Sequence, residues 1–146
     1  MQFDRLASNR SRHSINFLLS DTAERYAPQM LSILRIVAAL LFLEHGISRM
    51  FGFPAVVPTE FLSLYWFAGL IEMVGGALVA AGLFTRLAAF VMSGEMAMAY
   101  FYSHAPHGFF PIINRGDGAI LYCFVFLYIV VAGAGPWSLD AWRVRR

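Results

Sequence analysis

The chain has 146 residues, of which 59% are hydrophobic and 14% are charged, and its formal net charge is +2. An ordinary soluble domain carries roughly 25% charged residues, so this composition excludes one and predicts a single all-α bundle of membrane spans. The basic residues are arginines gathered near the termini, which argues against a nucleic-acid groove and makes the lipid bilayer the first expected partner.

Residues 1–29 are polar and rich in arginine. They lack the apolar core and the small-residue cleavage site of a secretory signal, and their acidic residues argue against a mitochondrial presequence. Asp21, followed three positions later by Glu24, is typical of the start of a helix. We therefore predict an N-terminal amphipathic helix that lies in the membrane interface.

The first two predicted spans are residues 30–51, with Pro28 in the first turn, and residues 61–84. Pro54 and Pro58 break the helix between them. The second span is apolar throughout except for Glu72, which lies near the bilayer midplane. An unpaired charge at that depth costs at least about 2.5 kcal/mol, so Glu72 needs a partner.

The third predicted span, residues 87–102, follows so closely that it must be an antiparallel neighbour of the second. It contains Glu95 near its middle and is short, so it either includes part of the loop 103–117 or crosses a thinned bilayer. The fourth span is residues 118–135. It contains Cys123, and because this is the only cysteine, an internal disulfide, a CxxC pair and a thiolate metal cage are excluded.

Four spans place both termini on one side of the membrane, together with the basic tail 141–146. The opposite side carries only Arg49 and Arg115, so the positive-inside rule predicts cytoplasmic termini. Trp137 and Trp142 are placed like interfacial anchors. The arginines on the terminal side are Arg5, Arg10, Arg12, Arg25, Arg86, Arg143, Arg145 and Arg146.

Ionisable side chains form a stripe along the first span. Arg35, His45 and Arg49 share this stripe with Phe42, one above the next. Glu44 points to the opposite side of the same helix. In a monomeric bundle it would face lipid, so it either contacts a partner subunit, is protonated, or lies where the helix is locally unwound.

On the second span, the face of Glu72 also carries Tyr65 and several glycines, which let helices approach closely in lipid. At about 1.5 Å per residue, Glu72 and Glu95 lie near the midplane, Arg35 roughly 8 Å toward the cytoplasm and His45 roughly 6 Å toward the outside. We expect Arg35 to pair with Glu72, since a permanent cation offsets a buried carboxylate more reliably than an imidazole.

Two interpretations of these residues stay open. In one, Glu72 and the glycines only hold helices together. In the other, three intramembrane carboxylates exceed their cationic partners, so at least one is protonated or meets a ligand or a proton path. This surplus fits proton handling during quinone reduction, and it equally fits a proton-coupled carrier.

No resident metal, haem or flavin is expected. His104 and His107, with His45 as a third candidate, form only a weak metal pattern because no carboxylate lies near them in a helix. The chain shows no haem-ligand pair, flavin loop or dithiol, so electrons for any redox reaction must come from a partner or a bound cofactor.

Several pieces of the sequence match in order and spacing one known family. They are LRIVAALLFLEHGISRMFGFP, GLIEMVGGALVAAGLFTRLAA, the group Asn114, Gly116 and Asp117, and GAGPWSLD. Over residues 30–140 the chain resembles the DoxX family of small bacterial membrane proteins. Arg49 stands where a lysine is common and Asp117 where a glutamate is common, while Glu44 and Glu95 match no family pattern.

The resemblance implies a four-helix protein of the bacterial inner membrane. Some relatives are similar to the membrane subunit of a thiosulfate:quinone oxidoreductase, and others are linked to complexes that handle oxidative or thiol stress. We therefore expect a quinone-binding subunit with a soluble or membrane redox partner. The alternatives are a small oligomeric proton-coupled transporter and a non-catalytic assembly scaffold. The candidate ligand or proton-relay residues are Arg35, His45, Arg49, Glu72 and Glu95, with Phe42 and Tyr65 lining the pocket and Glu44 at a homo-oligomer interface.

Overall fold

The computed structural model describes residues 2–57 and 59–146, and side chains from residue 21 onward. Every regular element in these ranges is helical, which confirms the predicted all-α class. Pro58, one of the two loop prolines in the prediction, lies outside the described residues. The elements are α1 (Gln2–Phe51), α2 (Leu64–Ala81), α3 (Thr85–Ala99), the π-helix η1 (Tyr100–His104), the 3₁₀ turn η2 (Ala105–His107), α4 (Pro111–Asn114), α5 (Asp117–Ala132) and α6 (Leu139–Val144).

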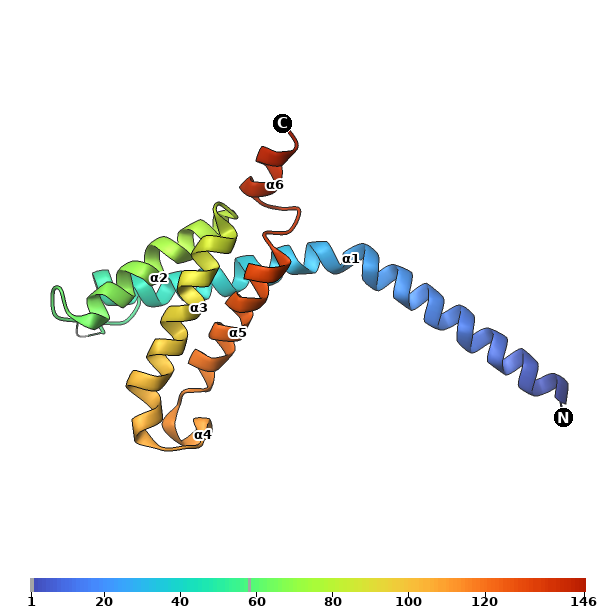
Figure 1. Cartoon of the computed structure of the whole chain (residues 1–146), viewed down its shortest axis with the longest axis horizontal. Coiled ribbons are helices and arrows are strands. Elements are labelled where there is room, and N and C mark those ends of the chain that lie inside the picture. The colour runs from blue at the N-terminus through green and yellow to red at the C-terminus, as the bar shows by residue number, and fades with distance from the viewer. Residues whose placement is uncertain (1, 58) are drawn as a thin grey trace.

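Helix α1 runs without a break through Pro28. The predicted helix start at Pro28 is therefore wrong. The missing proline N–H removes one helical bond, but the residues on both sides favour helix, and the Pro28 carbonyl still accepts a bond from the Ser32 hydroxyl at 3.3 Å. Figure 1 shows the N-terminal part of α1, in dark blue, extending away from the other helices. Its predicted place in the membrane interface stays a prediction, because the side chains of residues 2–20 lie outside the description.

The body of the molecule consists of two antiparallel helix pairs, α1 with α2 and α3 with α5, joined through α2 and α3 (Figure 1). Glycines permit the close approach of α1 and α2. A Cβ at Gly46 would come within 2.5 Å of the Met73 nitrogen and 2.8 Å of the Gly69 oxygen. The buried apolar core is formed by Ala38, Ala39, Phe42, Val79, Ala88, Ala89, Met92, Met96, Ala119, Phe126 and Ile129.

In the part of the chain that the structure describes, two helical segments are long and apolar enough to cross a bilayer, Asp21–Phe51 and Leu64–Ala81. Helix α5 is apolar but shorter, and it ends before Gly133, whose φ of +89° stops the helix earlier than predicted. Helix α3 continues directly into η1, so the third predicted span extends into the expected loop. The outer faces of these helices expose large apolar side chains, including Leu87 at 68% and Phe124 at 65%, as expected of a surface that meets lipid.

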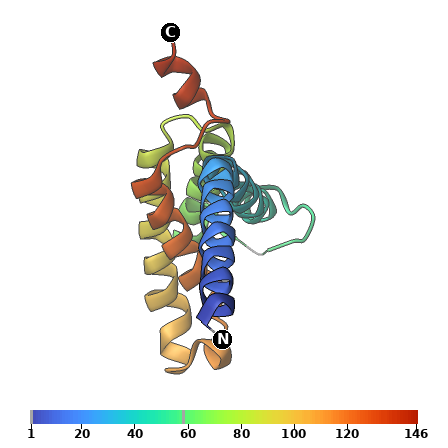
Figure 2. The ribbon, with the colours of Figure 1, turned by 90° about the vertical axis from the view of Figure 1, so that its right-hand side faces the viewer.

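The two ends of the body differ. Figure 2 shows α6 and the C-terminus beyond one end and the orange loop that contains α4 at the opposite end. We call the first the arginine-capped end, which comprises the α2–α3 turn, the end of α5, and α6. We call the second the loop end, which comprises η1, η2, α4 and the adjacent ends of α1 and α2.

Candidate functional site

An ion pair joins α1 and α2 toward the loop end. The Nε atom of Arg49 lies 3.1 Å from Oε2 of Glu72, and Glu72 is only 1% exposed. The geometry is that of an ion pair without a hydrogen bond, because within the described part of the chain Glu72 Oε2 has no hydrogen-bond donor. Arg49 also lies over the ring of Tyr65, 5.7 Å from its centroid. Glu72 therefore has charge compensation and an oxygen free to accept a further bond.

A cavity of about 240 Å³ surrounds this ion pair. It brings together the predicted residues Phe42, His45, Arg49 and Glu72, although these come from two helices. Residues from α3, η1 and α5 close the other side. The full lining is Phe42, His45, Arg49, Glu72, Met96, Ala99, His104, Arg115, Gly118, Ala119 and Tyr122.

A second cavity of about 300 Å³ adjoins the first. The two share Arg49, Met96, Ala99 and His104 in their walls, so they form neighbouring compartments of one site. Glu95 lines this second cavity, and its buried Oε2 has no hydrogen-bond partner among the described residues. The carboxylates of Glu95 and Glu72 are close enough to interact electrostatically. The remaining lining residues are Leu64, Tyr65, Ala68, Met98, Tyr102 and Ser103.

Two histidines at this site bond through Nδ1, and neither Nε2 has a hydrogen-bond partner among the residues that the structure describes. His45 Nδ1 lies 2.8 Å from the Leu41 carbonyl, and His104 Nδ1 lies 3.0 Å from the Asn114 carbonyl. Because a carbonyl only accepts, each Nδ1 carries a proton, and each Nε2 can accept a proton or, once protonated, donate one. Both rings can therefore exchange protons with a bound molecule.

The loop that holds His104 is fixed by the Asn114 side chain. Its Nδ2 donates to the Gly108 carbonyl at 2.7 Å, and its Oδ1 accepts from the Gly116 nitrogen at 2.8 Å. His104 itself ends the π-helix η1, a rare conformation that is often found at functional sites. From the sequence, His104 is only part of a weak metal pattern, and neither Arg115 nor Tyr122 is a candidate site residue. The Asn114 and Gly116 motif beside them was the one available signal.

Aromatic rings also line the first cavity. The ring of Tyr122 lies 5.4 Å from that of Phe42 and 6.3 Å from that of His45. It also stacks on Phe126 at 5.9 Å. The site thus combines an ion pair with a group of aromatic rings, of which Phe42 and Tyr122 are tilted by 54° to each other.

Arg35 does not belong to this site, so its predicted pairing with Glu72 is wrong. It is fully buried at the arginine-capped end, where Nε donates to the Ala134 carbonyl at 2.8 Å and Nη2 to the Trp137 carbonyl at 2.6 Å. Its Nη1 donates to the carbonyls of Val79 and Ala80 at the end of α2. A cation at helix carbonyl ends is stabilising, because those carbonyls lack helical partners and carry the negative end of the dipole.

Glu44 lines neither cavity, and it is exposed as its helical position predicts. It interacts electrostatically with Tyr122. Its predicted role at an oligomer interface stays a prediction.

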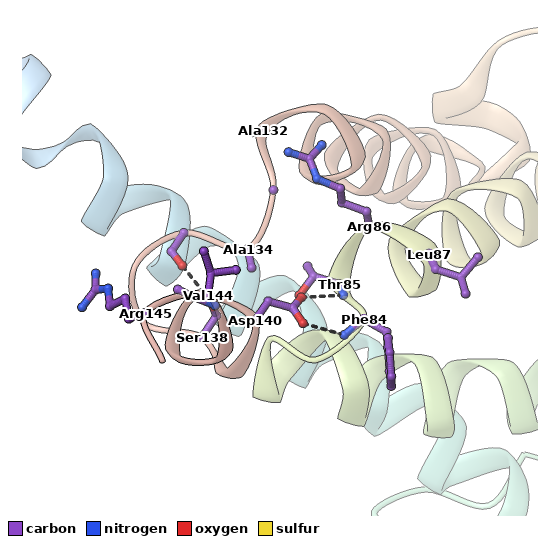
Figure 3. A pocket seen from close by; sticks show the side chains of 13 residues that line it. Phe84, Thr85, Arg86, Leu87, Ala132, Ala134, Ser138, Asp140, Val144 and Arg145 are labelled. Atoms are coloured by element: carbon purple, nitrogen blue, oxygen red, sulfur yellow. Dashed lines mark hydrogen bonds between the residues drawn. The ribbon is translucent and has the colours of Figure 1, made fainter.

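The arginine-capped end has a recess of its own (Figure 3). There the Asp140 carboxylate accepts from the nitrogens of Phe84 at 3.0 Å and Thr85 at 2.9 Å, at the start of α3. Burial opposes ionisation, but these hydrogen bonds and the nearby Arg143 outweigh it and hold the pKa of Asp140 below its ordinary value. At the same end of the molecule, Arg86 donates to the carbonyls of Val130 and Val131 near the end of α5.

A sequence model of the DoxX family matches residues 30–105, more than half of the chain. The chain belongs to the DoxX family. An uncharacterized protein of Haemophilus influenzae is 46% identical over 127 residues, covering 80% of this chain and 92% of that protein. No solved structure matches this DoxX chain. The matched segment contains the ion pair, Glu95 and His104, whereas Tyr122 and Asp140 lie beyond it.

Proposed function

We propose that this DoxX-family chain is a quinone-binding membrane subunit of an oxidoreductase that is linked through a partner to thiosulfate, thiols or oxidative stress. Its place would be the bacterial inner membrane. Four spans, α1, α2, α3 continued by η1, and α5, would put both termini and the arginine-capped end on the cytoplasmic side. The arginine distribution and the apolar outer faces of the helices support this orientation.

The residues of the two cavities fit a quinone head group. A quinone ring is flat and apolar with two carbonyl oxygens, so it needs an aromatic wall and hydrogen-bond donors. Phe42 and Tyr122 supply the aromatic rings, while Arg49 and the Tyr122 hydroxyl supply donors, and His104 Nε2 becomes a donor once it is protonated. The adjoining cavities together reach the range of roughly 300–1,000 Å³ that is usual for small-molecule sites.

The buried carboxyl oxygens of Glu72 and Glu95 are the observation that carries the proposal. A buried acceptor without a donor costs free energy unless it is protonated or meets a ligand. Quinone reduction consumes two protons, and two neighbouring carboxyl groups can hold and transfer them. Arg49 would orient the ring, and the free nitrogens of His45 and His104 would link the carboxyl groups to solvent.

Electrons must enter from outside the chain's own side chains. The single cysteine cannot form a dithiol, and the side chains that the structure describes, those of residues 21–57 and 59–146, include no group of three potential metal ligands. We therefore place the electron-carrying group on a partner protein or on a second bound cofactor.

Calorimetric titration of the purified chain with short-chain ubiquinone and menaquinone analogues tests this function. The Tyr122→Phe variant loses one donor at the aromatic wall and is expected to bind several-fold more weakly. Tyr128→Phe, an exposed change on the same helix, is the matched control and should bind like the wild type. If neither quinone binds the wild type, or both variants bind equally, the quinone site is wrong.

A proton-coupled carrier is the second candidate, favoured by one observation. Glu72 and Glu95 line neighbouring cavities and interact electrostatically. A proton transferred between these two carboxyl groups would pass from one cavity to the other. In that case Glu95→Gln and Glu44→Gln would abolish uptake or resistance while quinone-linked respiration stays intact. A scaffold without chemistry would show only altered expression in Glu72→Gln.

A further inference from the structure

The recess at the arginine-capped end is a large concavity far from the quinone site. Its volume is about 660 Å³, and it lies between the start of α3, the end of α5, and α6. Arg86 and Arg145 line it from different elements and lie at two sides of it in Figure 3. Arg143, on α6, lies 5.4 Å from the ring centroid of Phe84, another lining residue.

An apolar groove continues from this recess along α2 and α3. Its volume is about 450 Å³, and all of its lining residues are apolar. Phe84 and Leu87 line both the recess and the groove, so the two are contiguous. From Leu78 to Leu70 the groove follows about 12 Å of helix axis, close to half of the roughly 30 Å thickness of a bilayer core.

We propose that the recess and groove together bind one anionic phospholipid, with the phosphate head group at Arg86, Arg143 and Arg145 and an acyl chain between α2 and α3. The combination of an arginine-lined recess with a contiguous apolar groove favours this ligand over the alternatives. A free phosphate would use the arginines but leave the apolar groove empty, and a neutral lipid would use only the groove.

The charge of the recess favours an anionic head group. The one carboxylate in its wall, Asp140, is turned to the backbone nitrogens of Phe84 and Thr85 and is already satisfied there. Trp137 and Trp142, exposed at 55% and 52%, lie on the same end, as side chains at the level of lipid head groups do. Basic residues at the cytoplasmic surface attract anionic lipids, which are concentrated in that leaflet.

Native mass spectrometry of the detergent-purified full chain tests the proposal with dioleoylphosphatidylglycerol, dioleoylphosphatidylcholine and inorganic phosphate as probes. We expect one phosphatidylglycerol per chain and much weaker binding of phosphatidylcholine. The double variant Arg143→Gln, Arg145→Gln should weaken phosphatidylglycerol binding about 25-fold, at about fivefold per arginine. The lysine counterparts, which keep the charge, should restore most of it.

A bulky side chain placed in the groove tests separately whether an acyl chain binds there. Val91, a groove residue that is 44% exposed, is changed to tryptophan, and Val37→Trp on α1, 50% exposed and outside the groove, is the control. Helical circular dichroism verifies that each variant folds. The proposal requires Val91→Trp alone to displace the lipid. It is overturned if both tryptophans act alike, if the glutamine variants bind normally, or if inorganic phosphate alone displaces the lipid.

Discussion

Arg49 on α1 and Glu72 on α2 meet with 3.1 Å between Nε and Oε2, while the Arg49 side chain stays 23% exposed and that of Glu72 only 2%. Arg49 is therefore the solvent-accessible member of the ion pair, and Glu72 is the buried member. Because Arg49 also lines both cavities, it is the one residue that links charge compensation of Glu72 to each compartment.

Neutralising Arg49 alone should destabilise the fold. Arg49→Gln leaves the Glu72 carboxylate buried without its cation, at an expected cost of about 2–3 kcal/mol. This lies below the 3–5 kcal/mol typical of a fully buried pair, because Arg49 is partly solvated. Reversible unfolding in mixed micelles, followed by circular dichroism, measures the loss.

The matched test is the double variant Arg49→Gln, Glu72→Gln. It removes both charges and should be more stable than Arg49→Gln by about 1 kcal/mol or more, which a double-mutant cycle reports as coupling. Additive losses would mean that the two side chains are not coupled energetically.

Arg35 is expected to be essential for stability but not for quinone binding. Arg35→Gln removes four hydrogen bonds to carbonyls of α2 and of the α5–α6 connection, so we expect a loss of about 3 kcal/mol or more. Arg86→Gln, which removes two bonds at an exposed position, should cost less. The Arg35→Gln and Glu72→Gln losses should add, and strong coupling between them would contradict the separation of the two ends.

The comparison of Arg35 with Arg49 shows where sequence reasoning reaches its limit. Helical periodicity placed Phe42, His45 and Arg49 on one stripe, and they do line one cavity. Depth along the helix left Arg35 and His45 within reach of Glu72, and the permanent charge of Arg35 made it the expected partner. Arg35 instead bonds to carbonyls 44 to 102 residues away, at the end of α2 and in the α5–α6 connection, and only the folded chain brings these two segments together.

His104 illustrates the same limit at the other end. Composition and spacing indicate a loop there, but the π-helix that carries the histidine and the Asn114 bonds that fix the next turn arise from tertiary packing. The all-α class and the residue types of the candidate site were predictable because they follow from hydropathy and from the cost of buried charge.

Asp140 predicts a dependence of stability on acid pH. Its pKa in the folded chain lies below the unfolded value of about 3.8, so the carboxylate stabilises the fold above that pH. This contribution is lost as the pH falls through the folded pKa. Asp140→Asn should cost about 1 kcal/mol at pH 7, the usual size of a helix N-cap, reduced by solvent screening. The difference in melting temperature between the two proteins should narrow as the pH falls from 7 toward 3, and a constant difference would exclude the charge as the cause.

The close contact of α1 and α2 gives the sharpest structural prediction. Gly46→Ala would place a methyl group within 2.5 Å of the Met73 nitrogen, so the two backbones must move apart, at a cost of about 1–3 kcal/mol. That movement should also weaken quinone binding, because Arg49 and Glu72 lie on the separated helices. Gly94→Ala on α3 is the control: a Cβ there meets nothing within 4 Å, and replacing a helical glycine should leave stability unchanged or raise it by about 1 kcal/mol. Unfolding midpoints and quinone titration of the two variants give the comparison, and equal behaviour would mean that the α1–α2 contact is looser than 2.5 Å implies.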